Sequence, residues 1–180
     1  RRANDYRNGP WGDKFTPKQN NVFRYCFANI YGLPVSVYHE KYDQITTAIT
    51  KHEIDIVGLA EINLNFPSLG PNEQWIHRFP KLQNNSHYAT NAHSTSTTRK
   101  LYGGTAYLTS KATSPKVADK GTDPTGLGRW TWVKLTGRQG IQIRIISGYR
   151  PVQDHTNRAG TVYSQHEKYF LDQAITDNLA

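Results

Sequence analysis

This sequence of 180 residues has one cysteine, no methionine and no long apolar run. The single cysteine, Cys26, excludes a disulfide framework, and a lone thiol within an apolar run suits a reducing compartment. No segment approaches the roughly 18 apolar residues of a membrane span, and the N-terminus has no apolar signal core. We therefore expect an intracellular protein with no signal peptide and no transmembrane segment.

Several motifs that would name a chemistry directly are also missing. The seven histidines are scattered without metal-ligand spacing, and there is no cysteine pair that could bind zinc. The sequence contains neither a phosphate-binding P-loop nor a nucleophile elbow. Zinc modules, P-loop nucleotide hydrolases and α/β-hydrolases are thereby excluded.

Acidic residues are scarce relative to basic ones. Lysine and arginine number 22 against 14 aspartates and glutamates, which gives a formal net charge of +8 at pH 7. Such a balance favours a polyanionic partner, with nucleic acid as the first candidate. The surplus begins in residues 1–20, which we interpret as a polar basic arm without regular structure before a single domain at 21–180.

The order of apolar patterns predicts an α/β fold with mixed sheets rather than a strictly doubly wound one. Ile141, Ile143 and Ile145 alternate with polar residues, which predicts a strand with one buried face. Residues 113–128 are rich in turn residues and are predicted to be a long loop. The expected strands are about 22–29, 54–61, 88–90, 104–109, 130–135 and 141–147, and the expected helices are about 37–52, 71–83 and from 161 onward.

Two predicted buried strands each end in a polar side chain. The apolar run from Ile54 to Ala60 is followed by Glu61, and the run before it along the chain ends in Asn29. Ligands in open α/β sheets bind at such carboxyl ends, and oxygen ligands of this kind suit Mg²⁺. The alternative is that both residues simply mark where the chain returns to water.

Basic residues on predicted loops are candidates for phosphate contacts. Tyr149 and Arg150 follow the last predicted strand and could direct a hydroxyl and a guanidinium at a phosphate. Arg99 and Lys100 end a serine- and threonine-rich loop, and Arg129 lies in a glycine turn. The alternative for each is an ordinary solvated surface charge, with Tyr149 covering the edge of the core.

Taken in order, four segments resemble the endonuclease/exonuclease/phosphatase superfamily, in particular the endonuclease domain of LINE-like retroelements. The segments are Asn29-Ile30-Tyr31-Gly32-Leu33, Asp55 to Glu61, Gly103-Gly104-Thr105-Ala106-Tyr107 and Ser147-Gly148-Tyr149-Arg150-Pro151. The resemblance covers about residues 20–180. It implies part of a four-layer α/β sandwich of the deoxyribonuclease-I-like type, with two mixed sheets face to face and helices outside.

The resemblance also implies the roles of particular residues. Glu61 would bind Mg²⁺ or Mn²⁺, Asn29 would lie beside it to orient a phosphate or metal-bound water, and Tyr149 would contact the scissile phosphate. Independently of the resemblance, the charged residues Arg99, Lys100, Arg129 and Arg150 are the candidates for contacts with the DNA backbone. Tyr31 stands where the apurinic branch of the superfamily has an aspartate, which favours the retroelement branch and fewer protein carboxylates on the metal.

Two later motifs of the superfamily, Asp-x-Asn and Ser-Asp-His, do not occur in this sequence. They supply the residues that activate the water and a histidine that binds the phosphate. We therefore expect residues 21–180 to correspond to the N-terminal portion of such a domain, with its C-terminal strands absent and little or no nuclease activity in these 180 residues.

The sequence leaves three functions open. The first is the Mg²⁺-dependent DNA endonuclease domain of a retroelement, acting in the nucleus and possibly fused to a reverse transcriptase downstream. The second is a phosphatase of the same fold acting on a phosphorylated lipid or nucleotide. The third is a non-catalytic module that binds nucleic acid through its charge alone.

Overall fold

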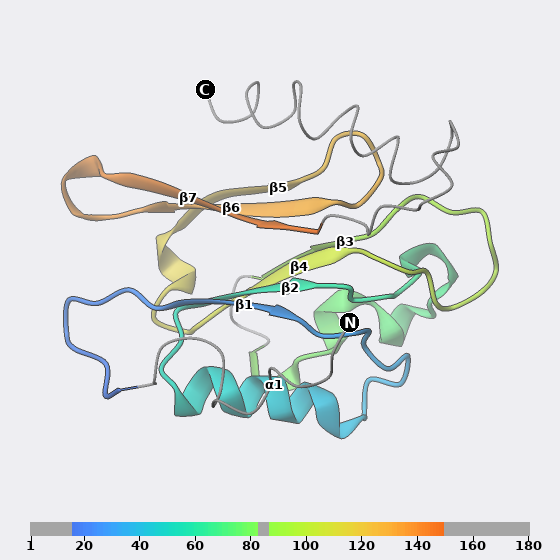
Figure 1. Ribbon diagram of the computed structural model, residues 1–180, viewed down its shortest axis with the longest axis horizontal. Helices are drawn as coiled ribbons and strands as arrows, with labels where there is room; N and C mark the ends of the chain where they lie inside the picture. The colour runs from blue at the N-terminus through green and yellow to red at the C-terminus, as the bar shows by residue number, and fades with distance from the viewer. Residues whose placement is uncertain (1–15, 83–86, 150–180) are drawn as a thin grey trace, which may run out of the picture.

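The computed structural model describes residues 16–82 and 87–149, which form two β-sheets and one α-helix (Figure 1). The first sheet has the strand order β1 (Tyr25–Asn29), β2 (Ile56–Ala60), β4 (Thr105–Thr109) and β3 (His87–Thr90). Strands β1 and β2 are parallel, whereas β4 runs antiparallel to both of its neighbours. The predicted mixed-sheet fold class is thus confirmed.

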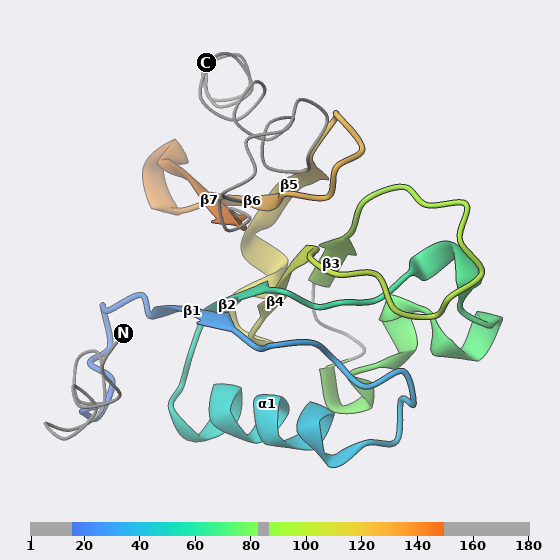
Figure 2. The ribbon, with the colours of Figure 1, turned by 45° about the vertical axis from the view of Figure 1, so that its right-hand side comes forward.

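The second sheet is antiparallel throughout and consists of β5 (Val117–Thr122), β6 (Trp130–Thr136) and β7 (Gln142–Gly148). It lies against one face of the first sheet, and the helix α1 (Glu40–Lys51) lies against the other (Figure 2). Three layers of the predicted four-layer sandwich are therefore present in the described residues. The helix predicted from residue 161 and the basic residues 1–15 lie outside them.

Helix α1 forms where the sequence predicts it, because apolar residues recur at helical spacing. It begins after His39, whose Nδ1 accepts the Lys41 backbone N–H at 3.2 Å and so caps the first turn. Tyr42 and Ile49 are buried on its inner face. They pack against β2 and the loops around it, which makes this layer the larger of the two apolar cores.

The smaller core lies between the sheets and is centred on Ile56, Tyr107, Val133 and Leu135. The sheets approach closely beside Gly58 of β2. A Cβ at this position would lie 2.3 Å from the Ser147 Oγ of β7 and 2.6 Å from the Tyr25 hydroxyl. A larger residue at Gly58 would displace these side chains, so the glycine allows the middle of β2 to lie close to the end of β7.

Two predicted elements differ from the structure. The expected helix at 71–83 is instead a series of short 3₁₀ turns at Pro71–Glu73, Trp75–His77 and Pro80–Leu82. Trp75, Phe79 and Leu82 are nevertheless buried, because the series packs its apolar side chains under the first sheet. The pattern identified the buried residues correctly but not the local backbone geometry.

The predicted loop at 113–128 contains the strand β5, paired with β6. Its sequence has almost no apolar alternation, so tertiary pairing rather than burial forms the strand. The predicted buried face of β7 is correct only at Ile145, which packs on the inter-sheet core. Ile141 and Ile143 are 60% and 49% exposed, because they lie next to the β6–β7 turn at Arg138–Gly140.

None of the helices in the described ranges has the length and apolar character that a bilayer-spanning segment requires.

Candidate functional site

The parallel pairing of β1 with β2 brings Asn29 and Glu61 to the same edge of the first sheet. Asn29 is directly opposite Ala60, so the side chain of Glu61 follows one residue later. Asn29 is exposed and Glu61 is half-buried. The two residues predicted from the strand pattern are therefore neighbours at the carboxyl end of the parallel pair.

The backbone around these residues is strained. Tyr31, Glu61 and Asn63 have φ angles of 49°, 55° and 54°, in the left-handed region that non-glycine residues rarely occupy. Each such residue costs on the order of 1–3 kcal/mol, and strain of this kind concentrates at functional sites. Three of the five non-glycine residues with positive φ in the described chain border this one edge.

Tyr149 reaches the same edge from the second sheet. Its backbone N–H donates to the Arg129 carbonyl at 2.8 Å, which continues the β6–β7 ladder by one residue. Its hydroxyl is hydrogen-bonded to Glu61. Burial first, and then the charge and hydrogen bond of Glu61, raise the pKa of Tyr149, so the phenol remains protonated and donates to the carboxylate.

Arg129 lies beneath Tyr149 and is only 4% exposed. Its guanidinium carbon is 5.8 Å from the centre of the Tyr149 ring, and its Nε has no hydrogen-bond partner among the described residues. Burial lowers the pKa of Arg129, while Tyr149 and Asp123 oppose that shift. A cation is thus held in a desolvated position next to Tyr149, which in turn is hydrogen-bonded to Glu61.

Gly103 makes room for this cation. It has a φ of +99°, and a Cβ there would lie 3.0 Å from an Arg129 terminal nitrogen and 3.6 Å from the Tyr149 ring. Of the two glycines that precede β4, Gly103 therefore leaves space for the Arg129 side chain, whereas Gly104 leaves space for Asn91 and Ile62.

A hollow of about 460 Å³ opens beside Glu61. Its walls come from the loops that follow β1 and β2 and from the loop that precedes β4. The lining residues are Tyr31, Gly32, Leu33, Pro34, His39, Glu61, Asn63, Lys100 and Tyr102. Asn29 is not among them, although it is adjacent in register.

The predicted phosphate contacts separate into three groups. Lys100 lines the hollow with Glu61, and Arg129 lies under Tyr149. Arg99 instead forms an ion pair with Glu73, which directs its charge toward the 3₁₀ segment. Arg150 lies outside the described residues.

Two asparagines that the sequence did not single out hold the site together. Asn63 accepts the Gly103 N–H at 2.7 Å, and Asn91 donates to the carbonyls of Leu64 and Leu101 at 2.9 and 2.7 Å. These bonds fix the loop before β4 onto the loop after β2. The signal in the sequence was weak, because asparagines in loops are common for many reasons.

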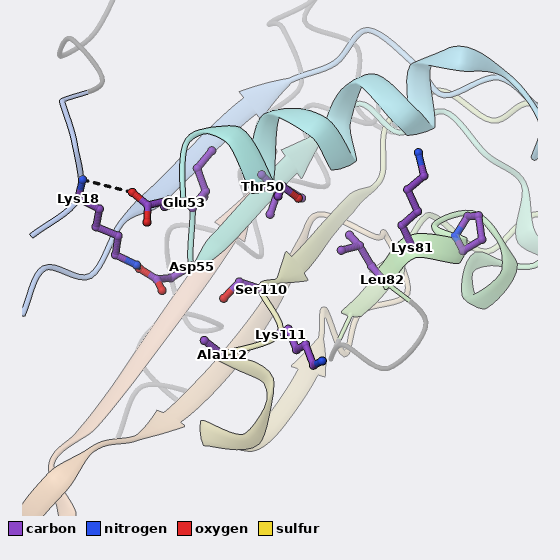
Figure 3. Close-up of a pocket in the computed structure, with 12 residues that line it drawn as sticks. Lys18, Thr50, Glu53, Asp55, Lys81, Leu82, Ser110, Lys111 and Ala112 are labelled. Atoms are coloured by element: carbon purple, nitrogen blue, oxygen red, sulfur yellow. Dashed lines mark hydrogen bonds and ion pairs between the residues drawn. The ribbon is translucent and has the colours of Figure 1, made fainter. Parts of the chain in front are cut away.

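A second hollow, of about 530 Å³, lies at the opposite end of the first sheet (Figure 3). It surrounds Asp55, a carboxylate that is buried and fully engaged. Asp55 accepts from Lys18 Nζ at 2.5 Å, from the Arg24 backbone N–H at 2.7 Å and from the Thr113 hydroxyl at 3.2 Å. These contacts fasten residues 16–24 to the sheet, so this carboxylate is structural.

The donor set at Glu61 is compatible with magnesium. Among the described residues no group of three or more histidine, cysteine, aspartate or glutamate side chains is placed to hold a metal ion. Mg²⁺ commonly takes only one or two protein carboxylates and completes its shell with waters and substrate phosphate. A half-buried carboxylate that lines an open hollow suits that mode, and the Asn29 amide oxygen keeps a free lone pair beside its bond to the Tyr31 N–H.

Comparison with known proteins gives a match at the level of the fold. No sequence profile of a protein family and no curated protein sequence matches this chain. A solved structure described as an endonuclease/exonuclease/phosphatase family protein from Leptotrichia buccalis C-1013-b superposes with a TM-score of 0.52 at 13% identity. The two chains share a fold. The match covers 82% of this chain and 62% of the solved one, so this chain spans less than two thirds of its length.

Proposed function

We propose that this chain provides part of the active site of a Mg²⁺-dependent DNA endonuclease. The observation that supports it is the convergence of Glu61, Tyr149 and the buried Arg129 where β2 and β7 end. The three come from different strands and loops, and each has a property suited to a phosphodiester. The shared fold with an endonuclease/exonuclease/phosphatase family protein supports the same chemistry.

Each of these residues has a separate role in the proposal. Glu61, with Asn29 beside it, would hold Mg²⁺ or Mn²⁺. The ion would supply electrostatic stabilisation of the charge that develops on the attacked phosphate. The protonated Tyr149 hydroxyl would donate to a non-bridging phosphate oxygen. Arg129, beneath the Tyr149 ring, would partly neutralise the negative charge of the phosphate.

The charge distribution favours a polymeric substrate over a small phosphate ester. The chain has a net charge of +8, and Lys100 lines the hollow beside Glu61. A phosphodiester backbone extending away from the hollow would meet such charges along its length. The Tyr149-Arg150-Pro151 sequence supports the narrower proposal of a retroelement endonuclease that acts in the nucleus and is fused to a reverse transcriptase.

Hydrolysis also needs a group that activates water. Because the sequence contains neither Asp-x-Asn nor Ser-Asp-His, we expect these 180 residues to nick supercoiled plasmid at background rates. Cleavage therefore cannot test the proposal in these residues. Metal binding can, because in the proposal it depends on Glu61 and not on the later motifs.

The test is Mn²⁺ binding followed by electron paramagnetic resonance, with plasmid nicking measured in parallel. Glu61→Gln keeps the size and hydrogen-bonding capacity of the side chain but removes its charge. We expect it to weaken Mn²⁺ binding roughly tenfold or more. The control is Glu40→Gln, which removes an exposed carboxylate on α1 and should leave Mn²⁺ binding unchanged.

Equal Mn²⁺ affinity of the Glu61→Gln variant and the unaltered chain would refute the metal site. If DNA still bound in a strongly salt-dependent manner, the chain would be the non-catalytic nucleic-acid module instead. Nicking that depended on Glu61 would support the endonuclease and contradict the expected inactivity. Hydrolysis of a phosphomonoester without any nicking would identify a phosphatase.

A further inference from the structure

Two tyrosines at the proposed active-site hollow are almost fully exposed. Tyr31 and Tyr102 are 88% and 89% exposed, and both line the hollow that contains Glu61. They come from opposite loops, one following β1 and the other preceding β4. Large aromatic side chains contribute most to a fold when buried, so two exposed rings at one opening call for a functional explanation.

The Tyr31 ring stands on a fixed backbone. Its N–H donates to Asn29 Oδ1 at 3.1 Å, and the next residue, Gly32, donates to the Glu61 carbonyl at 2.6 Å. The carbonyls of Ile30 and Gly32 both accept from Lys41 Nζ at 2.6 Å. The turn is therefore tied on both sides of Tyr31, even though a φ of 49° is unfavourable for tyrosine.

Tyr102 is held in the same way. The residue before it, Leu101, donates to the Asn63 carbonyl at 3.4 Å and accepts from Asn91 Nδ2 at 2.7 Å. The residue after it, Gly103, donates to Asn63 Oδ1 at 2.7 Å. Asn63 also limits the Tyr31 loop, because its Nδ2 lies 3.0 Å from where a Gly32 Cβ would be. Asn63 thus holds the Tyr102 loop by hydrogen bonds and packs against the Tyr31 loop at Gly32.

We propose that Tyr31 and Tyr102 form a stacking site for unpaired nucleobases next to the phosphate at Glu61. This inference rests on the proposed function and specifies its substrate as DNA that is single-stranded or locally unpaired. Because the backbone that carries each ring is already ordered, only side-chain freedom is lost when a base stacks on the ring. The hollow is large enough for a small ligand, and Lys100 offers a charge for the adjoining phosphate.

The geometry favours unpaired over paired bases for a physical reason. In a duplex the faces of a base are covered by its neighbours, so a protein ring can stack only on a terminal, flipped or single-stranded base. Phosphate contacts alone do not distinguish these states. A stacking site beside the reacting phosphate would therefore direct the nuclease to unpaired positions.

The test measures binding in EDTA, where neither metal nor cleavage contributes. The probes are a fluorescein-labelled single-stranded oligonucleotide, the same oligonucleotide with central abasic positions, and a duplex of equal length, all followed by fluorescence anisotropy. Replacing Tyr31 or Tyr102 by alanine should weaken single-strand binding roughly 5- to 150-fold. Replacement by phenylalanine should preserve binding within about twofold, because the ring is retained.

Two further variants separate stacking from folding and from general aromatic contact. Tyr31→Gly removes the ring and relaxes the positive φ, so it should raise the thermal unfolding temperature while it weakens binding. Tyr38→Ala removes a tyrosine that is 95% exposed but does not line the hollow, and it should leave binding unchanged.

Equal affinity for the abasic and intact oligonucleotides would overturn the stacking site, as would alanine variants that bind single strands like the unaltered chain. Tighter binding of the duplex, insensitive to both tyrosines, would do the same. Ring-dependent binding without Glu61-dependent Mn²⁺ binding would retain the stacking site and refute the nuclease. Glu61-dependent Mn²⁺ binding together with DNA binding that does not depend on the rings would support the nuclease and refute the stacking site.

Discussion

Arg129 keeps a positive charge at a position where only 4% of the residue is exposed. Asp123 lies near enough to favour that charge, but its carboxylate oxygens accept the Arg129 backbone N–H at 3.0 Å and the Thr125 N–H at 2.8 Å. The attraction of Asp123 therefore offsets only part of the free energy that desolvation of the guanidinium costs. We propose that this buried charge serves to bind an anion.

We expect Arg129→Met to separate folding from binding. Methionine fills a similar volume without a charge, so the free energy of unfolding should be unchanged or rise by about 1–2 kcal/mol. DNA affinity should fall roughly tenfold, because a charge-assisted contact to phosphate is lost. Urea denaturation and fluorescence anisotropy measure the two effects.

The control for this variant is Arg138→Met, which removes the same charge from the exposed β6–β7 turn. It should lower DNA affinity less than Arg129→Met does. A variant of Arg129 that unfolded readily while DNA binding stayed intact would show the arginine to be structural only.

At the scale of the element, the short strand β3 contains a buried histidine whose hydrogen-bonding capacity is only partly satisfied. His87 begins this strand and packs its ring near Trp75, with centroids 6.3 Å apart. Its Nδ1 has no hydrogen-bond partner among the described residues. Burial, and then the charge of Lys120, lower the pKa of His87 below 6.5.

This shift predicts a pH-dependent stability. Between the folded pKa and 6.5 the unfolded chain binds more protons at His87 than the folded chain does, so stability falls as the pH drops below about 6.5. Urea denaturation at pH 7.5 and 5.5 should show this loss, and His87→Gln should reduce it. His77→Gln, at an exposed position, should leave the pH dependence as it is. An unchanged slope in the His87 variant would contradict the assignment.

At the scale of the whole molecule, the loops that follow β1, β2 and β7 gather at one end of the two sheets, and Lys100 lines the hollow there. The carboxyl ends of β1, β2 and β7 point toward the same side in Figure 1, and the loops bearing Lys100 and Arg129 gather there. The net charge of +8 adds a long-range attraction for polyanions.

We therefore expect DNA binding to depend steeply on salt. If Lys100 and Arg129 each neutralise one phosphate, affinity should fall roughly 7- to 12-fold between 50 and 200 mM salt. Anisotropy titrations at several salt concentrations give the slope directly. Lys100→Ala should reduce the slope of log affinity against log salt by about 0.9, the value for one phosphate contact. Lys51→Ala, at the far end of α1, should leave the slope unchanged. A salt-independent affinity would exclude a phosphate-backbone partner.

Apolar patterns within short segments of the sequence predicted those helices and strands that form because one of their faces is buried. Helix α1 and strands β1, β2, β4, β6 and β7 follow from apolar spacing, because burial of one face depends on residues a few positions apart. The same patterns placed Asn29 and Glu61 at strand ends. Strand β5 and the 3₁₀ series escaped prediction, because pairing with β6 and packing under the sheet decide their conformation.

The sequence by itself thus determined the mixed α/β class, the basic character and the identity of the polar residues at the strand ends. Only the tertiary structure decided that Glu61 meets Tyr149, that Arg129 is buried beneath the Tyr149 ring, and that Arg99 is occupied by Glu73. The physical reason is the close approach of two sheets at Gly58 and Ser147, which joins residues that lie far apart along the chain. Contacts of that kind arise from packing between layers, and no periodicity within a single segment encodes them.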